Sequence, residues 1–160
     1  MSRPPKDPLQ RPLGFPYRIP FVEELGLELW AFGDGQAELR VDLAQAHLNS
    51  LDVAHGGVLM TMLDVAMAQA ARSAVSLQPA QGAGVVTIEM KTSFMRPAQG
   101  RLRALGQVMH RTSSMAFTEG RVFDESGRLC AHGTGTFKYL RERPPRPAAT
   151  DSGPHAHQET

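Results

Sequence analysis

The amino-acid sequence predicts an α+β domain in which one long helix is covered by an antiparallel β-sheet. The helix is predicted over residues 55–75, which are rich in the good helix formers Ala, Leu, Met and Gln. Segments on both sides of it alternate apolar and polar residues with the two-residue period of a half-buried strand. The predicted order is two strands, the helix and four strands, which is typical of the α+β class.

The two strands before the helix are predicted to form a β-hairpin over residues 27–42. Apolar side chains alternate on either side of Gly33-Asp34-Gly35. A Gly-Asp-Gly cluster between two alternating segments is typical of a hairpin turn.

The long helix carries one apolar stripe. Its members recur at spacings of three or four residues, which places them on one face of a helix: Val58, Met62, Val65, Ala66 and Gln69. We therefore expect this face to pack against the sheet.

Four strands are predicted after the helix, over residues 85–95, 101–110, 114–123 and 128–140. In the first of them, strict alternation predicts that Val86, Ile88, Met90, Thr92 and Phe94 share one face. The same alternation predicts that Thr87 lies on the opposite face, with Glu89, Lys91 and Ser93.

The chain of 160 residues is long enough for one core, and its prolines mark the ends of the domain. Ten of the 12 prolines fall in the first or last twenty residues. We therefore expect a proline-rich tail over residues 1–20, a domain over 21–141 and a disordered tail over 142–160. Cys130 is the only cysteine, which favours a reducing, cytoplasmic compartment, and no apolar run is long enough to span a membrane.

The net charge of +1 argues against a nucleic-acid-binding protein that works by bulk charge. The charge is uneven, however, because residues 21–64 carry eight acidic side chains against one basic, and residues 65–140 carry nine basic against four acidic. The basic half suits a ligand that bears phosphate, or it is simply a set of solvated strand faces.

Two features of the helix carry possible chemistry. Gly56 and Gly57 stand at its start, where unpaired N–H groups can hold a developing oxyanion, although two glycines can also simply make a tight turn. Asp64 interrupts the apolar run of the helix. It is either a catalytic carboxylate or an acidic side chain that faces solvent. The sequence has no G-x-S-x-G elbow, metal-binding spacing or nucleotide-binding glycine motif, so we expect water-based chemistry without a metal or cofactor.

The stretch HLNSLDVAHGGVLMTMLDVAMA, residues 47–68, resembles the hotdog-fold acyl-CoA thioesterases of the phenylacetic-acid-pathway and 4-hydroxybenzoyl-CoA thioesterase group. The shared pattern is N-x5-H-G-G with an acidic residue nine positions after the histidine. Residues 94–98 also match the group's F-x-R-P-A pattern at the end of a strand. One departure is Asp52, where relatives often have glycine three residues before the histidine.

The resemblance implies a hotdog fold and a role for each matching residue. The backbone N–H of Gly56 polarises the thioester carbonyl, and Asp64 of the other subunit acts as general base on water or as nucleophile. Asn49 positions the carbonyl or the water, His55 orients the loop and the thioester, and Thr87 holds the attacking water.

The resemblance also implies an aryl- or fatty-acyl-CoA substrate, with coenzyme A as part of the substrate rather than a cofactor. Further substrate contacts are expected from Gly57, Met60, Arg96 and Arg111, the two arginines meeting the nucleotide phosphates. The protein is expected to be at least a homodimer and commonly a homotetramer. Two alternatives stay open, namely a hotdog acyl-CoA hydratase or dehydratase and a non-catalytic module that binds acyl-CoA or an acyl carrier.

Overall fold

The computed structural model describes residues 11–76, 78–81 and 83–140. The predicted C-terminal tail and the first ten residues of the predicted N-terminal tail lie outside the described residues. Within the rest of the N-terminal segment, Leu13 donates its N–H to the carbonyl of Leu29 at 2.7 Å.

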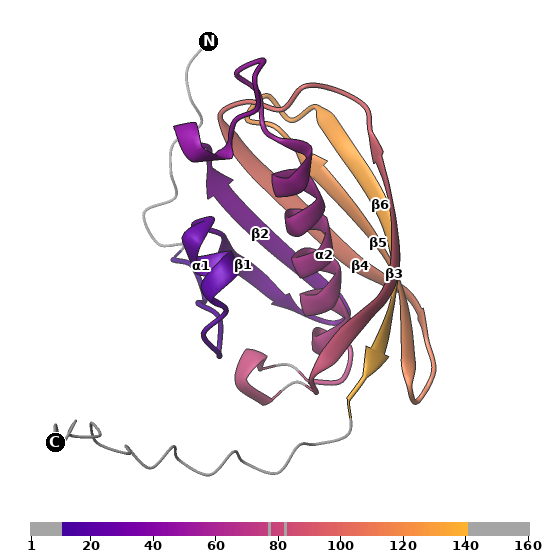
Figure 1. Ribbon diagram of the computed structural model, residues 1–160. Coiled ribbons are helices and arrows are strands. Elements are labelled where there is room, and N and C mark those ends of the chain that lie inside the picture. Colours follow the sequence, from indigo (N-terminus) through magenta and orange to yellow (C-terminus); the bar gives the residue numbers. More distant parts are fainter. Residues whose placement is uncertain (1–10, 77, 82, 141–160) are drawn as a thin grey trace, which may run out of the picture.

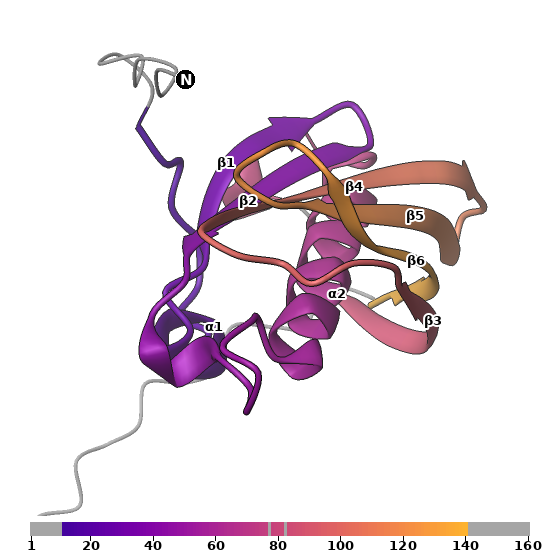
Figure 2. The same ribbon diagram turned by 90° about the horizontal axis from the view of Figure 1, so that it is seen from above.

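Six antiparallel strands form one sheet in the order β1-β2-β4-β5-β6-β3, and the sheet curves around the long helix α2 (Figures 1 and 2). This arrangement confirms the predicted α+β class. The strands are β1 (Glu28–Gly33), β2 (Gln36–Asp42), β3 (Val85–Phe94), β4 (Arg101–Arg111), β5 (Met115–Phe123) and β6 (Leu129–Tyr139). The helices are α1 (Pro20–Glu24), α2 (Gly56–Ser73) and the short 3-10 turns η1 (Gln45–His47) and η2 (Pro79–Gln81). Helix α1 was not predicted, because five residues show no helical period.

The core lies between α2 and the concave face of the sheet. Every member of the predicted apolar stripe is buried, and Met62 and Ala66 have no exposed surface at all. Gly106 on β4 lets the two backbones approach closely, because a Cβ there would collide with the Ala66 carbonyl of the helix. This close packing fixes where along the sheet each turn of α2 lies.

Strand β3 differs from its predicted alternation at one point. Its register with β6 shifts between Thr87 and Glu89, so Ile88 is an extra residue in the ladder. Thr87 is therefore turned toward α2, where its hydroxyl reaches Asp64. The ring of Phe94 also lies against the helix, beside Gly56. The prediction that Thr87 and Phe94 lie on opposite faces is wrong, because strict alternation does not survive a β-bulge.

Strand β3 is also an edge of the sheet, since it pairs with β6 alone. Its ten residues are mostly exposed, including Val86 and Ile88. Among the described residues, no helix combines the length and the hydropathy needed to cross a membrane.

Candidate active site

The loop before α2 is held by its own hydrogen bonds. The side-chain oxygen of Asn49 accepts from the backbone N–H of Leu51 at 2.8 Å, and the backbone N–H of His55 donates to the His47 carbonyl at 2.8 Å. Asp52 has a φ of 56°, in the left-handed region that favours glycine. Aspartate is one of the few residues other than glycine that tolerates this conformation.

The two glycine N–H groups in the first turn of α2 differ in whether they have an acceptor within the protein. The Nδ1 atom of His55 accepts from the backbone N–H of Gly57 at 2.9 Å. The ring of the residue that precedes the helix thus caps its first turn. The Gly56 N–H has no acceptor among the described groups. Of the two glycines, Gly56 is therefore the one that offers a free donor to a ligand.

The phenyl ring of Phe94 lies directly against Gly56. A Cβ built on Gly56 would meet the ring at 3.4 Å, which is an ordinary van der Waals contact, so the ring lies about one methyl group away from the glycine backbone. Met60, one helical turn beyond Gly56, is 42% exposed, and Met95 at the end of β3 is 50% exposed. The free N–H thus lies at an apolar part of the surface.

The structure brings Asp64 and Thr87 together. The hydroxyl of Thr87 donates to Oδ1 of Asp64 at 2.7 Å, which fixes the orientation of the carboxylate and leaves Oδ2 for another partner. Sequence reasoning had singled out both residues, but only the bulge in β3 makes their contact possible.

Gly56 and Asp64 do not meet within one chain. They are eight residues apart on α2, a rise of roughly 12 Å. A thioester carbonyl and the water that attacks it must lie within about 3.5 Å of each other. One chain therefore presents two half-sites, a donor beside Phe94 and a carboxylate beside Thr87, rather than one complete site.

The two candidate phosphate-binding arginines lie at opposite ends of the sheet. Arg96 donates to the Leu129 carbonyl at 2.9 Å, where β6 begins. Arg111 ends β4, near the place where Tyr139 ends β6. The length of β6 separates these places by roughly 30 Å, so within one chain the arginines do not share a ligand phosphate.

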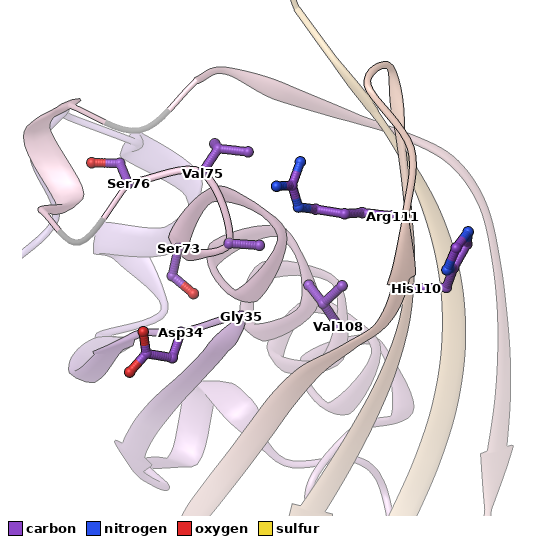
Figure 3. Close-up of a pocket in the computed structure, with 9 residues that line it drawn as sticks. Asp34, Gly35, Ser73, Val75, Ser76, Val108, His110 and Arg111 are labelled. Atoms are coloured by element: carbon purple, nitrogen blue, oxygen red, sulfur yellow. The ribbon is translucent and has the colours of Figure 1, made fainter.

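Arg111 points into an open pocket of about 670 Å³ at the C-terminal end of α2 (Figure 3). The pocket lies between the end of the helix, the β1–β2 turn and β4, with Asp34, Ser73 and Val108 in its wall. Burial raises the pKa of the nearby Tyr139 phenol, and the positive charge of Arg111 opposes that rise. The residues that line the pocket come from three segments far apart in the sequence, so no local pattern could have predicted this pocket.

Two sulfur-containing side chains lie in the core rather than at a site open to a ligand. Cys130 is fully buried, and burial raises the pKa of its thiol. Met67 is also fully buried in the core, in contrast to the exposed Met60. Over the described part of the chain, no three His, Cys, Asp or Glu side chains gather as a metal site would require.

Comparison with known proteins identifies relatives over most of the chain. The family model of the thioesterase superfamily matches residues 51–131. A candidate esterase of Halobacterium salinarum is 32% identical over 74% of this chain and 83% of its own length. A conserved protein of Pseudomonas aeruginosa is 32% identical, with a TM-score of 0.71 over 78% of this chain and 97% of the other. The PaaI protein of the phenylacetic acid degradation operon of Escherichia coli shares the fold, with 21% identity and a TM-score of 0.70 over 78% of this chain and 86% of its own.

Proposed function

Because the chain belongs to the thioesterase superfamily and has the hotdog fold of its PaaI-type members, we propose that it hydrolyses acyl-CoA thioesters to a free acid and coenzyme A. The acyl group is an aryl or fatty one. The observation that carries the proposal is the pair of half-sites, a free Gly56 N–H and a carboxylate oriented by Thr87. These are the two groups that the hydrolysis of a thioester needs, since a thiolate leaves without a general acid.

The chemistry follows from these two groups. The carbonyl oxygen of the thioester accepts from the Gly56 N–H, where the positive end of the helix also lies. Oδ2 of Asp64 takes a proton from water while the water oxygen attacks the carbonyl carbon. The C–S bond of the tetrahedral intermediate then breaks and coenzyme A leaves as its thiolate. In a single turnover in ¹⁸O-water, label in Asp64 itself would show that the carboxylate acts as nucleophile instead.

Two chains are needed to assemble the reaction, so we infer a homodimer at minimum. The edge of β3 is free to pair with the same edge of a second copy. Gly56 packs on Phe94 and Asp64 on Thr87, at opposite ends of the same stretch of β3 and α2. A two-fold axis midway along this stretch, near Met60 and Lys91, exchanges the ends and brings Gly56 toward the partner subunit's Asp64.

Cross-linking tests this pairing. Lys91 is exposed on β3, near the inferred axis, so Lys91→Cys is expected to give a covalent dimer with a short bis-maleimide. Gln107→Cys is the matched control, since Gln107 lies in the same row of the sheet but three strands further from the edge. Equal cross-linking of the two variants would contradict the pairing, and the mass of the native protein in solution distinguishes dimer from tetramer.

The function is tested by release of free thiol from a panel of acyl-CoAs. Asp64→Asn is expected to lower kcat by about 10²- to 10⁴-fold while substrate binding is retained. Asp42→Asn, which changes an exposed carboxylate paired with Arg101 at the far end of β2, is the control and is expected to keep full activity. Undiminished thiol release by Asp64→Asn would refute the mechanism. If the wild type binds acyl-CoA without turnover, the result would favour the non-catalytic binding module. If it adds water to an enoyl-CoA, the result would favour the hydratase.

The nucleotide end of coenzyme A is proposed to contact Arg96 or Arg111, which lie too far apart in one chain to act on it together. The open pocket beside Arg111 supports that residue, because the guanidinium points into it. Alanine variants of the two arginines distinguish them. The variant that loses a phosphate contact raises KM for an acyl-CoA but not for the same acyl group on pantetheine, which has no nucleotide.

A further inference from the structure

We propose that the ring of Phe94 is the surface on which the acyl group packs, and that this residue makes the enzyme prefer large apolar acyl groups over small ones. The proposal rests on the proposed function and adds a specificity-determining residue to it.

Phe94 is unusual in its surroundings. It lies on the face of β3 that is turned toward the helix, where side chains are ordinarily buried, yet it is 54% exposed. Phenylalanine is among the residues most often found inside proteins. A large aromatic ring left open on the inner face of a strand therefore points to a surface that is covered in the assembled site, where the substrate meets the partner subunit.

The position of the ring relative to Gly56 places it within reach of the substrate. A carbonyl that accepts from the Gly56 N–H places its oxygen about 2.9 Å from that nitrogen, and its carbon lies about 1.2 Å beyond the oxygen. The ring lies in van der Waals range of a Cβ built on the same glycine. A group attached to the carbonyl carbon is therefore close enough to pack on Phe94.

Two groups are attached to that carbon, the acyl chain and the sulfur of the pantetheine arm. The surface around Gly56 favours the acyl chain. Met60, one helical turn beyond Gly56, adds an exposed apolar side chain, and methionine adapts to acyl groups of different shape. The pantetheine arm carries amides and ends at phosphates, which require polar partners, whereas a hydrocarbon or aryl group needs only apolar contact.

The test compares acetyl-, hexanoyl- and benzoyl-CoA as substrates for Phe94→Ala. We expect kcat/KM to fall about tenfold or more for hexanoyl- and benzoyl-CoA, mainly through KM, and to change less than about twofold for acetyl-CoA. Phe117→Ala is the matched control, since Phe117 is a similarly exposed phenylalanine (42%) on the outer face of the sheet. Its kcat/KM is expected to stay unchanged for all three substrates.

Each result decides a different point. An equal loss for all three substrates, or no loss for any, would overturn the role of Phe94 while leaving thioesterase activity in place. If wild-type protein cleaves none of a wider acyl-CoA panel, the proposed function itself fails. Should Phe94→Ala disturb folding or assembly, Phe94→Leu keeps an apolar side chain in the strand and is expected to lower kcat/KM for benzoyl-CoA more than for acetyl-CoA.

Discussion

The two ends of helix α2 are built in opposite ways. At the N-terminal end, the Gly56 N–H has no acceptor among the described groups and the adjacent Phe94 is half exposed. At the C-terminal end, the buried guanidinium of Arg72 donates to the carbonyls of Pro79 and Ala83 and packs over the Tyr17 ring. Burial lowers the pKa of Arg72.

This difference separates the groups available for chemistry from those that stabilise the fold. A backbone donor left without a partner costs little where a ligand or water reaches it, and it binds a developing negative charge when substrate arrives. A buried guanidinium is stable only when its donors are paired. Through these contacts Arg72 links the segment after the helix, at Pro79 and Ala83, to Tyr17 in the N-terminal segment. Substitutions at Gly56 should therefore change activity, and those at Arg72 should change stability.

The largest effect is expected from Gly56→Pro, which removes the donor and little else. Proline is favoured at the first position of a helix, and the preceding His55 already has an extended ψ of 139°, as a residue before proline requires. We expect kcat to fall by about 10²- to 10³-fold with the unfolding midpoint nearly unchanged. Gly56→Ala keeps the N–H and is expected to lose far less. Similar rates for the two variants would show that this N–H does not act on the substrate.

A smaller effect, on stability alone, is expected from Arg72→Met. The variant keeps most of the apolar stem but leaves the Pro79 and Ala83 carbonyls without their donor. We expect the free energy of unfolding in urea to fall by about 2–3 kcal/mol, while kcat of the folded protein is unchanged. A fall in kcat at full folding would mean that the two ends of the helix are not independent.

The smallest effect is expected at Asp52, in the loop that leads into the N-terminal end. Its φ of 56° is costly for an ordinary side chain, so Asp52→Ala should destabilise the fold by about 1 kcal/mol. Asp52→Gly is expected to be as stable as the wild type or slightly more so. Urea denaturation of the two variants measures the difference, and an alanine variant as stable as the glycine variant would contradict the assigned backbone strain.

The sequence alone was sufficient for the class of fold, the long helix and the hairpin, because side-chain periods of two and 3.6 residues are local properties of the chain. It also identified the Gly56 turn and Asp64, since a glycine pair before an apolar run and a carboxylate within it are visible in a few residues. The spacing of Asn49, His55 and Asp64 pointed to the thioesterase family that the comparisons then showed.

The tertiary structure decided how these parts meet. The bulge at Ile88 turns Thr87 toward Asp64, and a bulge depends on pairing with β6 rather than on the β3 sequence. The sheet topology sends Arg96 and Arg111 to opposite ends and gathers three distant segments around the Arg111 pocket. Each of these is a relation between segments remote in sequence, which only the packed chain fixes, because it depends on hydrogen bonds and contacts that no single segment contains.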